Sequence, residues 1–212
     1  MKNNYPLFLF FFILVIWGLY RYAFHFSIWI DEFLIKPFIY LIPTVYIVRI
    51  LERKSLSSIG LLRKNLIKNI LIGIVLGIFI SAEAILTKNI KSGHSVFNPD
   101  NLPVLSILGV YLLSFATGFT EEVVFRGYIL TRFEETFKNG FISIALSSLL
   151  FVIVHFPLII FVLKYSLSDL INYSVLILIL GILNGLMFKQ TKTLTAPTII
   201  HSFWNFSAVM FR

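Results

Sequence analysis

Side chains capable of acid–base chemistry interrupt three of the long apolar segments of this chain. The segments carry them as Thr-Glu-Glu-Val-Val-Phe-Arg-Gly, Phe-Val-Ile-Val-His and His-Ser-Phe-Trp-Asn. An ionisable residue inside a membrane span costs about 2.5–3.5 kcal/mol on insertion scales, so each one calls for a functional or structural reason. The candidate residues are Glu121, Glu122, Arg126, His155, His201 and Asn205.

Helical spacing sorts the charged residues of the first segment into two roles. Glu122 and Arg126 are four residues apart, so they share a helix face and can form an ion pair. Glu121 is rotated by about 100° from its neighbour, so the two carboxylates cannot use that Arg equally. One acid is therefore structural and the other is left available, although spacing alone does not say which.

The same four-residue spacing recurs in the other two segments. His201 and Asn205 can direct a ring N–H and a side-chain amide at a common target, and Phe151 and His155 also share a face. A carboxylate and an imidazole together can activate a water molecule as general bases. A His and an Asn are suitable donors to the oxyanion that forms when water attacks a peptide carbonyl. The residues therefore indicate hydrolysis by an activated water, without a covalent nucleophile.

Metal-dependent chemistry is the weaker alternative. Two His and a Glu could in principle ligate a metal ion, but the sequence contains no His-Glu-x-x-His motif. The absence of Cys excludes disulfides, thiolate catalysis and Cys-ligated zinc. We expect neither a metal nor a cofactor.

The elements that position these residues must be membrane helices. Of the 212 residues, 58% are hydrophobic and 13% are charged, and the mean hydropathy is +0.90. Soluble domains have about 45–50% apolar and about 25% charged residues. The composition excludes an ordinary soluble enzyme and a disordered tail. It predicts an all-α polytopic transmembrane bundle of six to eight spans, forming one domain over residues 1–212 with a catalytic cavity inside the bilayer.

Seven apolar runs are long enough to be spans, given that about 20 residues cross a bilayer. Two of them carry Gly-x-x-x-Gly, at Gly73 and Gly77 and at Gly181 and Gly185, which predicts close helix packing. Asn184 lies inside the second of these motifs and can hydrogen-bond across helices. The predicted spans are Leu7–Phe26, Phe33–Leu51, Leu66–Thr87, Val104–Leu130, Phe141–Leu163, Leu170–Phe188 and Pro197–Phe211.

The net charge of +8 arises mostly from Lys and Arg between the apolar runs, so we interpret these residues as topology determinants rather than nucleic-acid ligands. Their distribution predicts a cell-membrane protein with a cytoplasmic N-terminus, and it assigns Arg21 and Lys36 to the outer side. The basic segment Glu52–Asn69 is predicted to lie along the inner surface, attracted to anionic lipid, or to form a solvated loop.

Depth along the spans provides a test that is independent of the motifs. At 1.5 Å per helical residue, Glu121, His155 and His201 lie about 15, 21 and 8 Å from the inner surface. The three sites can therefore converge in one cavity in the inner half of the bilayer.

The three motifs together resemble those of the CPBP family (CAAX proteases and bacteriocin-processing enzymes, also called the Abi family) of intramembrane glutamic endopeptidases. Glu-Glu-x-x-x-Arg, Phe-x-x-x-His and His-x-x-x-Asn occur here in that order, each on its own predicted span. The resemblance covers residues 104–211, the predicted catalytic core. It implies that Glu121 is the base, that His155 is its partner, that His201 and Asn205 form the oxyanion hole, and that Glu122 and Arg126 support the site.

Three functions are compatible with these residues. The first is an intramembrane endopeptidase that acts within the lipid bilayer on a membrane-associated peptide or protein, with no nucleic-acid partner. The second is a non-catalytic membrane scaffold or immunity protein of the same fold, since family members are linked to bacteriocin immunity. The third is a small transporter with the buried acids as a proton relay, although no repeated half supports it. The sequence specifies neither the substrate nor the oligomeric state.

Overall fold

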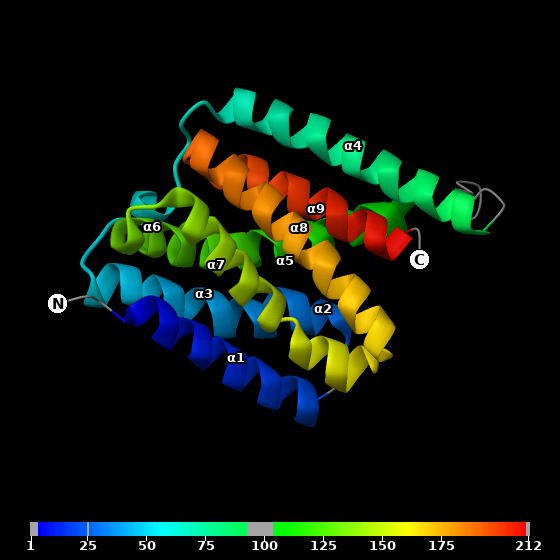
Figure 1. The fold of residues 1–212 in the computed structure, drawn as a ribbon, viewed down its shortest axis with the longest axis horizontal. Coiled ribbons are helices and arrows are strands. Elements are labelled where there is room, and N and C mark those ends of the chain that lie inside the picture. The colour runs from blue at the N-terminus through cyan, green and yellow to red at the C-terminus, as the bar shows by residue number, and fades with distance from the viewer. Residues whose placement is uncertain (1–3, 25, 93–103, 211–212) are drawn as a thin grey trace.

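The computed structural model describes residues 4–24, 26–92 and 104–210, and every regular element in these ranges is a helix. Figure 1 shows the helices as one bundle in which the chain runs back and forth along a common direction. The α-helices are α1 (Tyr5–Ala23), α2 (Ile28–Ile30), α3 (Lys36–Tyr46), α4 (Leu66–Ser92), α5 (Val104–Glu122), α6 (Thr131–Phe137), α7 (Gly140–Ile153), α8 (Leu167–Thr191) and α9 (Thr195–Met210). Between them lie the π-helical segments η1 (Asp31–Ile35), η2 (Ile47–Leu51), η5 (Val123–Leu130) and η6 (Leu158–Leu163) and the 3₁₀ segment η3 (Leu56–Ile59).

Six of the described helices are long and apolar enough to cross a membrane, so this is a multi-pass membrane protein. They cover the first six predicted spans, and π-helical segments extend several of them without a break. The seventh predicted span, Pro197–Phe211, corresponds to α9, which has 16 residues. Phe211 itself lies outside the described residues. The predicted all-α bundle is confirmed.

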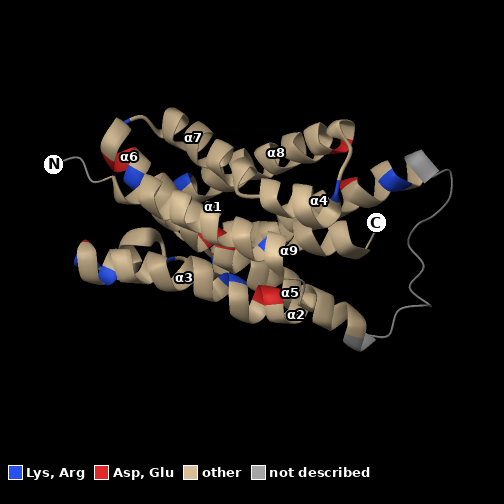
Figure 2. Ribbon diagram, turned by 90° about the horizontal axis from the view of Figure 1, so that it is seen from below, with Lys and Arg blue, Asp and Glu red and all other residues tan. Residues whose placement is uncertain are grey.

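The outer surface of the bundle is as apolar as a lipid-facing surface must be. Large side chains such as Phe8, Ile67 and Phe141 are 65%, 75% and 81% exposed, a pattern that a water-soluble monomer would avoid. Figure 2 shows that most charged residues lie near helix ends, whereas a smaller group lies in the middle of the bundle. That inner group forms the candidate site.

Helix α9 occupies the centre of the motif-bearing half and packs against α4, α5 and α8. The predicted glycine contacts are confirmed. A Cβ added at Gly77 would lie 2.4 Å from the Phe203 ring, and one at Gly73 would lie 2.8 Å from Ile199, so only glycine permits α4 this close to α9. Gly181 likewise brings α8 against Ser148 of α7.

Side chains and backbone geometry define where several helices begin and end. Asn139 caps α7 by accepting from the backbone N–H groups of Phe141 and Ile142, and Ser166 caps α8 in the same way. Three helical segments end at a lysine in the left-handed region, where its charge complements the helix dipole. These lysines are Lys138, Lys164 and Lys192, with φ of 55°, 50° and 56°.

The basic segment Glu52–Asn69 is anchored to the end of the bundle. Ile59 is fully buried. The Glu52 carboxylate accepts hydrogen bonds from Tyr128 Oη at 2.8 Å and Arg132 Nε at 2.9 Å. We call Glu52, Tyr128 and Arg132 the end cluster.

Two of the π-helical segments adjoin the buried charges. Segment η5 follows directly after Glu121 and Glu122, and η1 contains Asp31 and Glu32. Because π-helical turns inside α-helices occur frequently at functional sites, their position here directs attention to the same region.

Candidate active site

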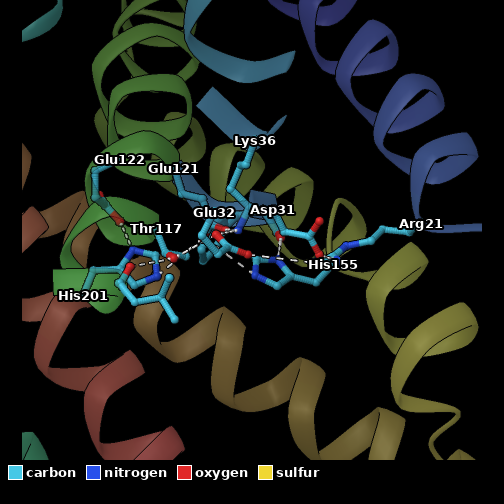
Figure 3. A network of polar contacts seen from close by, with 11 residues as sticks. Arg21, Asp31, Glu32, Lys36, Thr117, Glu121, Glu122, His155 and His201 are labelled. Atoms are coloured by element: carbon cyan, nitrogen blue, oxygen red, sulfur yellow. Dashed lines mark hydrogen bonds and ion pairs between the residues drawn. The ribbon is translucent and has the colours of Figure 1, made fainter. Parts of the chain in front are cut away.

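Glu121 lies at the end of α5 and is 4% exposed. Its two carboxylate oxygens have different surroundings. Oε1 is 3.0 Å from the ammonium nitrogen of Lys36. Oε2 has no hydrogen-bond partner among the described residues, and it lies 3.8 Å from His155 Nε2 and 3.5 Å from His201 Nε2 (Figure 3). One oxygen is thus held by a cation while the other faces two imidazoles.

Both imidazoles are oriented through their other ring nitrogen. His155, in the turn after α7, places Nδ1 2.7 Å from the carbonyl oxygen of Phe151. His201 on α9 places Nδ1 2.8 Å from Glu122 Oε1. Both of these partners are acceptors, so each Nδ1 carries a hydrogen, and Nε2 is the ring nitrogen that faces Glu121.

Glu122 is buried more completely than Glu121. It has no exposed surface, and its Oε1 is 2.9 Å from Asn184 Nδ2 on α8 and 3.1 Å from Arg126 Nη1. The predicted Glu122–Arg126 pair and the predicted cross-helix hydrogen bond of Asn184 are both present. Glu122 therefore ties α5, α8 and α9 together and orients His201.

Phe151 lies at the junction of the three motifs. Its ring centroid is 4.2 Å from the guanidinium carbon of Arg126, a cation–π geometry. The edges of the His155 and His201 rings meet it with centroid separations of 4.7 and 5.7 Å. This side chain is 1% exposed, so its position is fixed by packing.

A cavity of about 130 Å³ adjoins Glu121. It is lined by polar side chains that include Glu121, His155 and Asn205, and by apolar ones that include Leu113 and Trp204. A water molecule occupies about 30 Å³ of liquid, so the volume accommodates a nucleophilic water together with part of a substrate. The arrangement can activate water beside a bound carbonyl group.

The structure brings the predicted site residues together, as the depth argument required. Five of them belong to one network of contacts, and Asn205 lines the cavity that Glu121 and His155 also line. Two details differ from expectation. Glu121 is paired with Lys36 rather than left without a cation, and Nδ1 of His201 is already engaged by Glu122, which leaves Nε2 as the nitrogen that faces Glu121.

The sequence interpretation missed a group of charges from the N-terminal half. Arg21 and Lys36, assigned above to the outer side, are 7% and 5% exposed and lie inside the bundle with Asp31 and Glu32. Arg21 pairs with Asp31, and Lys36 Nζ is 2.6 Å from Glu32 Oε2 (Figure 3). Their assignment as topology determinants is wrong, because each finds a buried carboxylate that offsets its removal from water. The Glu32–Lys36 spacing of four residues was the signal that could have identified them.

In the described part of the chain, no group of three or more His, Cys, Asp and Glu side chains is arranged to hold a metal ion. The Nε2 atoms of His155 and His201 lie 3.8 and 3.5 Å from Oε2 of Glu121. The nearest cation to that carboxylate is the Lys36 ammonium group.

Residues 103–207, about half of the chain, match the family model described as type II CAAX prenyl endopeptidase Rce1-like. No curated protein and no solved structure matches the chain. The matched residues contain all three motifs, so the chain belongs to the CPBP family, and its fold is that of an intramembrane CAAX-type protease. The match begins beyond the segment that supplies Lys36.

Proposed function

We propose that this protein is an intramembrane endopeptidase that uses Glu121 to activate water. The observation that carries the proposal is the Glu121 carboxylate, a group of the cavity lining whose Oε2 has no hydrogen-bond partner among the described residues and lies 3.8 and 3.5 Å from two oriented imidazoles. Buried polar atoms in native proteins are almost always hydrogen-bonded, and the exceptions include catalytic groups that await a water or substrate.

The geometry supports a reaction in two stages. A water molecule that donates to Glu121 Oε2 and to His155 Nε2 attacks the peptide carbonyl carbon, and one of its protons passes to these bases. The carbon–oxygen bond forms, negative charge develops on the carbonyl oxygen, and donors on α9 stabilise it. The carbon–nitrogen bond then breaks as the proton is returned to the leaving amine.

His201 and Asn205 have separate tasks at the oxyanion. The Asn205 amide donates from the cavity wall without any change of protonation. His201 donates from Nε2 only when both ring nitrogens carry a proton, because Nδ1–H points at Glu122. Glu122 is positioned to pair with that cation, and Arg126 balances the Glu122 charge in the resting state.

The proposed substrate is a membrane-associated peptide or protein. The mostly apolar lining of the cavity, which includes Leu113, Leu158 and Trp204, suits a segment entering from lipid rather than from water. We propose further that the protein resides in the cell membrane with its N-terminus in the cytoplasm, which places the site in the inner half of the bilayer.

The test compares membrane peptides from cells that express the wild type or Glu121→Gln. The amide cannot accept a proton, so we expect cleavage of the substrate to fall by about 100- to 10,000-fold at equal protein level. Glu83→Gln is the matched control, since Glu83 is an exposed carboxylate on α4 that accepts a hydrogen bond from the Thr87 hydroxyl group. A cellular phenotype that survives in Glu121→Gln with no change in peptides would favour the scaffold or immunity alternative and reject the protease.

A further inference from the structure

Lys36 connects the two halves of the molecule at the reacting carboxylate. It is the first residue of α3, outside the residues that match the family, and its side chain is 6% exposed. Its ammonium nitrogen lies 2.6 Å from Glu32 Oε2 and 3.0 Å from Glu121 Oε1. It also lines the cavity that adjoins Glu121.

We propose that Lys36 is a positioning residue for the reaction, an inference that rests on the proposed function. By binding Oε1, it fixes the rotation of the Glu121 carboxylate and leaves Oε2 directed at the two imidazoles. Without this contact either oxygen could turn toward His155, and the base would no longer be held in one geometry. Misplacing a reacting group by about 1 Å can reduce a rate by about 100-fold.

The partners of Lys36 are themselves held in place, which a positioning role requires. The Glu32 carboxylate accepts a hydrogen bond from Thr117 Oγ1 at 2.8 Å, and Thr117 lies one helical turn before Glu121 on α5. Arg21 pairs with Asp31 and lies 3.7 Å from Glu32 Oε1. These contacts lead from α1 through η1 to α3 and α5, and Figure 3 shows them as one line of polar side chains.

The aromatic residues around Lys36 restrict its ammonium group further. Trp17 of α1 is 3% exposed, and its ring centroid lies 5.4 Å from Lys36 Nζ. A cation at this distance from an indole face is attracted by the ring quadrupole. Lys36 is therefore constrained by two carboxylates and one ring, so it cannot leave Glu121 without losing several contacts.

The experiment measures kcat and KM for cleavage in liposomes, using a substrate found by the peptide comparison and expressing activity per folded molecule. For Lys36→Met we expect kcat to fall by about 100-fold while KM stays within about threefold, because the ammonium group of Lys36 is bound to Glu32 and Glu121 rather than directed at the substrate. Lys54→Met is the matched control. The ammonium nitrogen of Lys54 also lies 3.1 Å from a glutamate, Glu135, but this pair is at the surface. For Lys54→Met, kcat and KM should therefore equal those of the wild type.

A double variant separates positioning from folding. Lys36→Met with Glu32→Gln removes one positive and one negative charge, so it relieves the buried imbalance but still leaves Glu121 without its cation. If Lys36 acts on the reaction, the double variant regains part of the lost thermal stability and stays about 100-fold slow. Recovery of activity together with stability overturns the proposal, and so does a failure of both variants to fold, since either result makes Lys36 a residue of the fold alone.

The outcome is distinguishable from a failure of the proposed function. If Glu121→Gln cleaves normally, the glutamate mechanism is wrong and Lys36 has no reaction to support. If Glu121→Gln is inactive while Lys36→Met keeps full kcat, the mechanism stands and only the positioning role is rejected.

Discussion

Two buried clusters in this protein, the end cluster and the central site, contain the same kinds of side chain. The end cluster places the Glu52 carboxylate against Arg132, whose guanidinium carbon is 5.3 Å from the centroid of the Tyr128 ring. The central site places Glu122 against Arg126, which lies over the Phe151 ring. In both places a carboxylate, an arginine and an aromatic ring stack together inside the bundle.

The clusters differ in how completely their polar atoms are satisfied. Both oxygens of Glu52 accept hydrogen bonds, Oε1 from Tyr128 and Oε2 from Arg132. In the central site, by contrast, Oε2 of Glu121 and Oε2 of Glu122 have no hydrogen-bond partner among the described residues. A fully satisfied network stabilises one structure, whereas an unsatisfied carboxylate of a cavity-lining residue, here Glu121, retains the capacity to bind a ligand or a reacting water. The comparison separates a cluster with a structural role from the proposed active site.

The largest effect that would test this contrast is expected for Arg126→Met. The substitution leaves Glu122 buried with no cation, so we expect a loss of about 3–5 kcal/mol in the free energy of unfolding. Denaturant-induced unfolding in mixed micelles measures it. Adding Glu122→Gln to Arg126→Met should recover part of the loss, because the amide removes the uncompensated charge. A loss below about 1 kcal/mol for the single variant would show that the central pair is not needed for the fold.

An intermediate effect, on rate rather than stability, is expected for Asn205→Ala. Removing one oxyanion donor should lower kcat by about 100- to 1,000-fold with an unchanged unfolding midpoint. Asn69→Ala supplies the opposite pattern. Asn69 is buried near the end of the bundle and donates to Thr193 at 2.9 Å, so its loss should destabilise the protein without slowing each folded molecule. Equal rates for Asn205→Ala and wild type would remove Asn205 from the site.

The smallest of the three effects is expected for Glu52→Gln in the end cluster. Arg132 keeps a second carboxylate, Glu135, at 3.1 Å, so the variant should lose only about 1.5–3 kcal/mol of unfolding free energy. Cleavage per folded molecule should not change. A fall in kcat comparable to that of Asn205→Ala would mean that the two clusters are coupled, and the contrast between them would not hold.

The motif-bearing half of the chain was predictable because its signals are local. Glu122 and Arg126 are four residues apart, and so are Phe151 and His155 and also His201 and Asn205, so helix geometry alone places each pair on one face. The lengths of the apolar runs predicted the membrane helices, and the similar depths of the three motifs predicted that they converge. The sequence could not specify which oxygen of Glu121 binds Lys36 and which faces the imidazoles, because this depends on contacts between distant segments.

The N-terminal half was misread because a charge beside an apolar run has two physical solutions. Lys36 can mark a loop at the membrane surface or can be buried against a carboxylate, and hydropathy favours the first. In the structure Lys36 is buried against carboxylates. The helix begins at Ile28, so Asp31, Glu32 and Lys36 all lie inside one continuous helical stretch. The four-residue interval between Glu32 and Lys36 was visible, but its connection to Glu121, 85 residues away from Lys36, was not.

The ring of Phe151 explains why the second motif needs an aromatic residue one turn before its histidine. One face receives the positive charge of Arg126, while its packing against both imidazoles keeps their planes nearly perpendicular to it, at 82° and 89°. An aliphatic side chain could fill the volume but would offer no negative π surface to the guanidinium. A single hydrocarbon ring thus separates the guanidinium group of Arg126 from the two imidazoles while remaining in contact with all three.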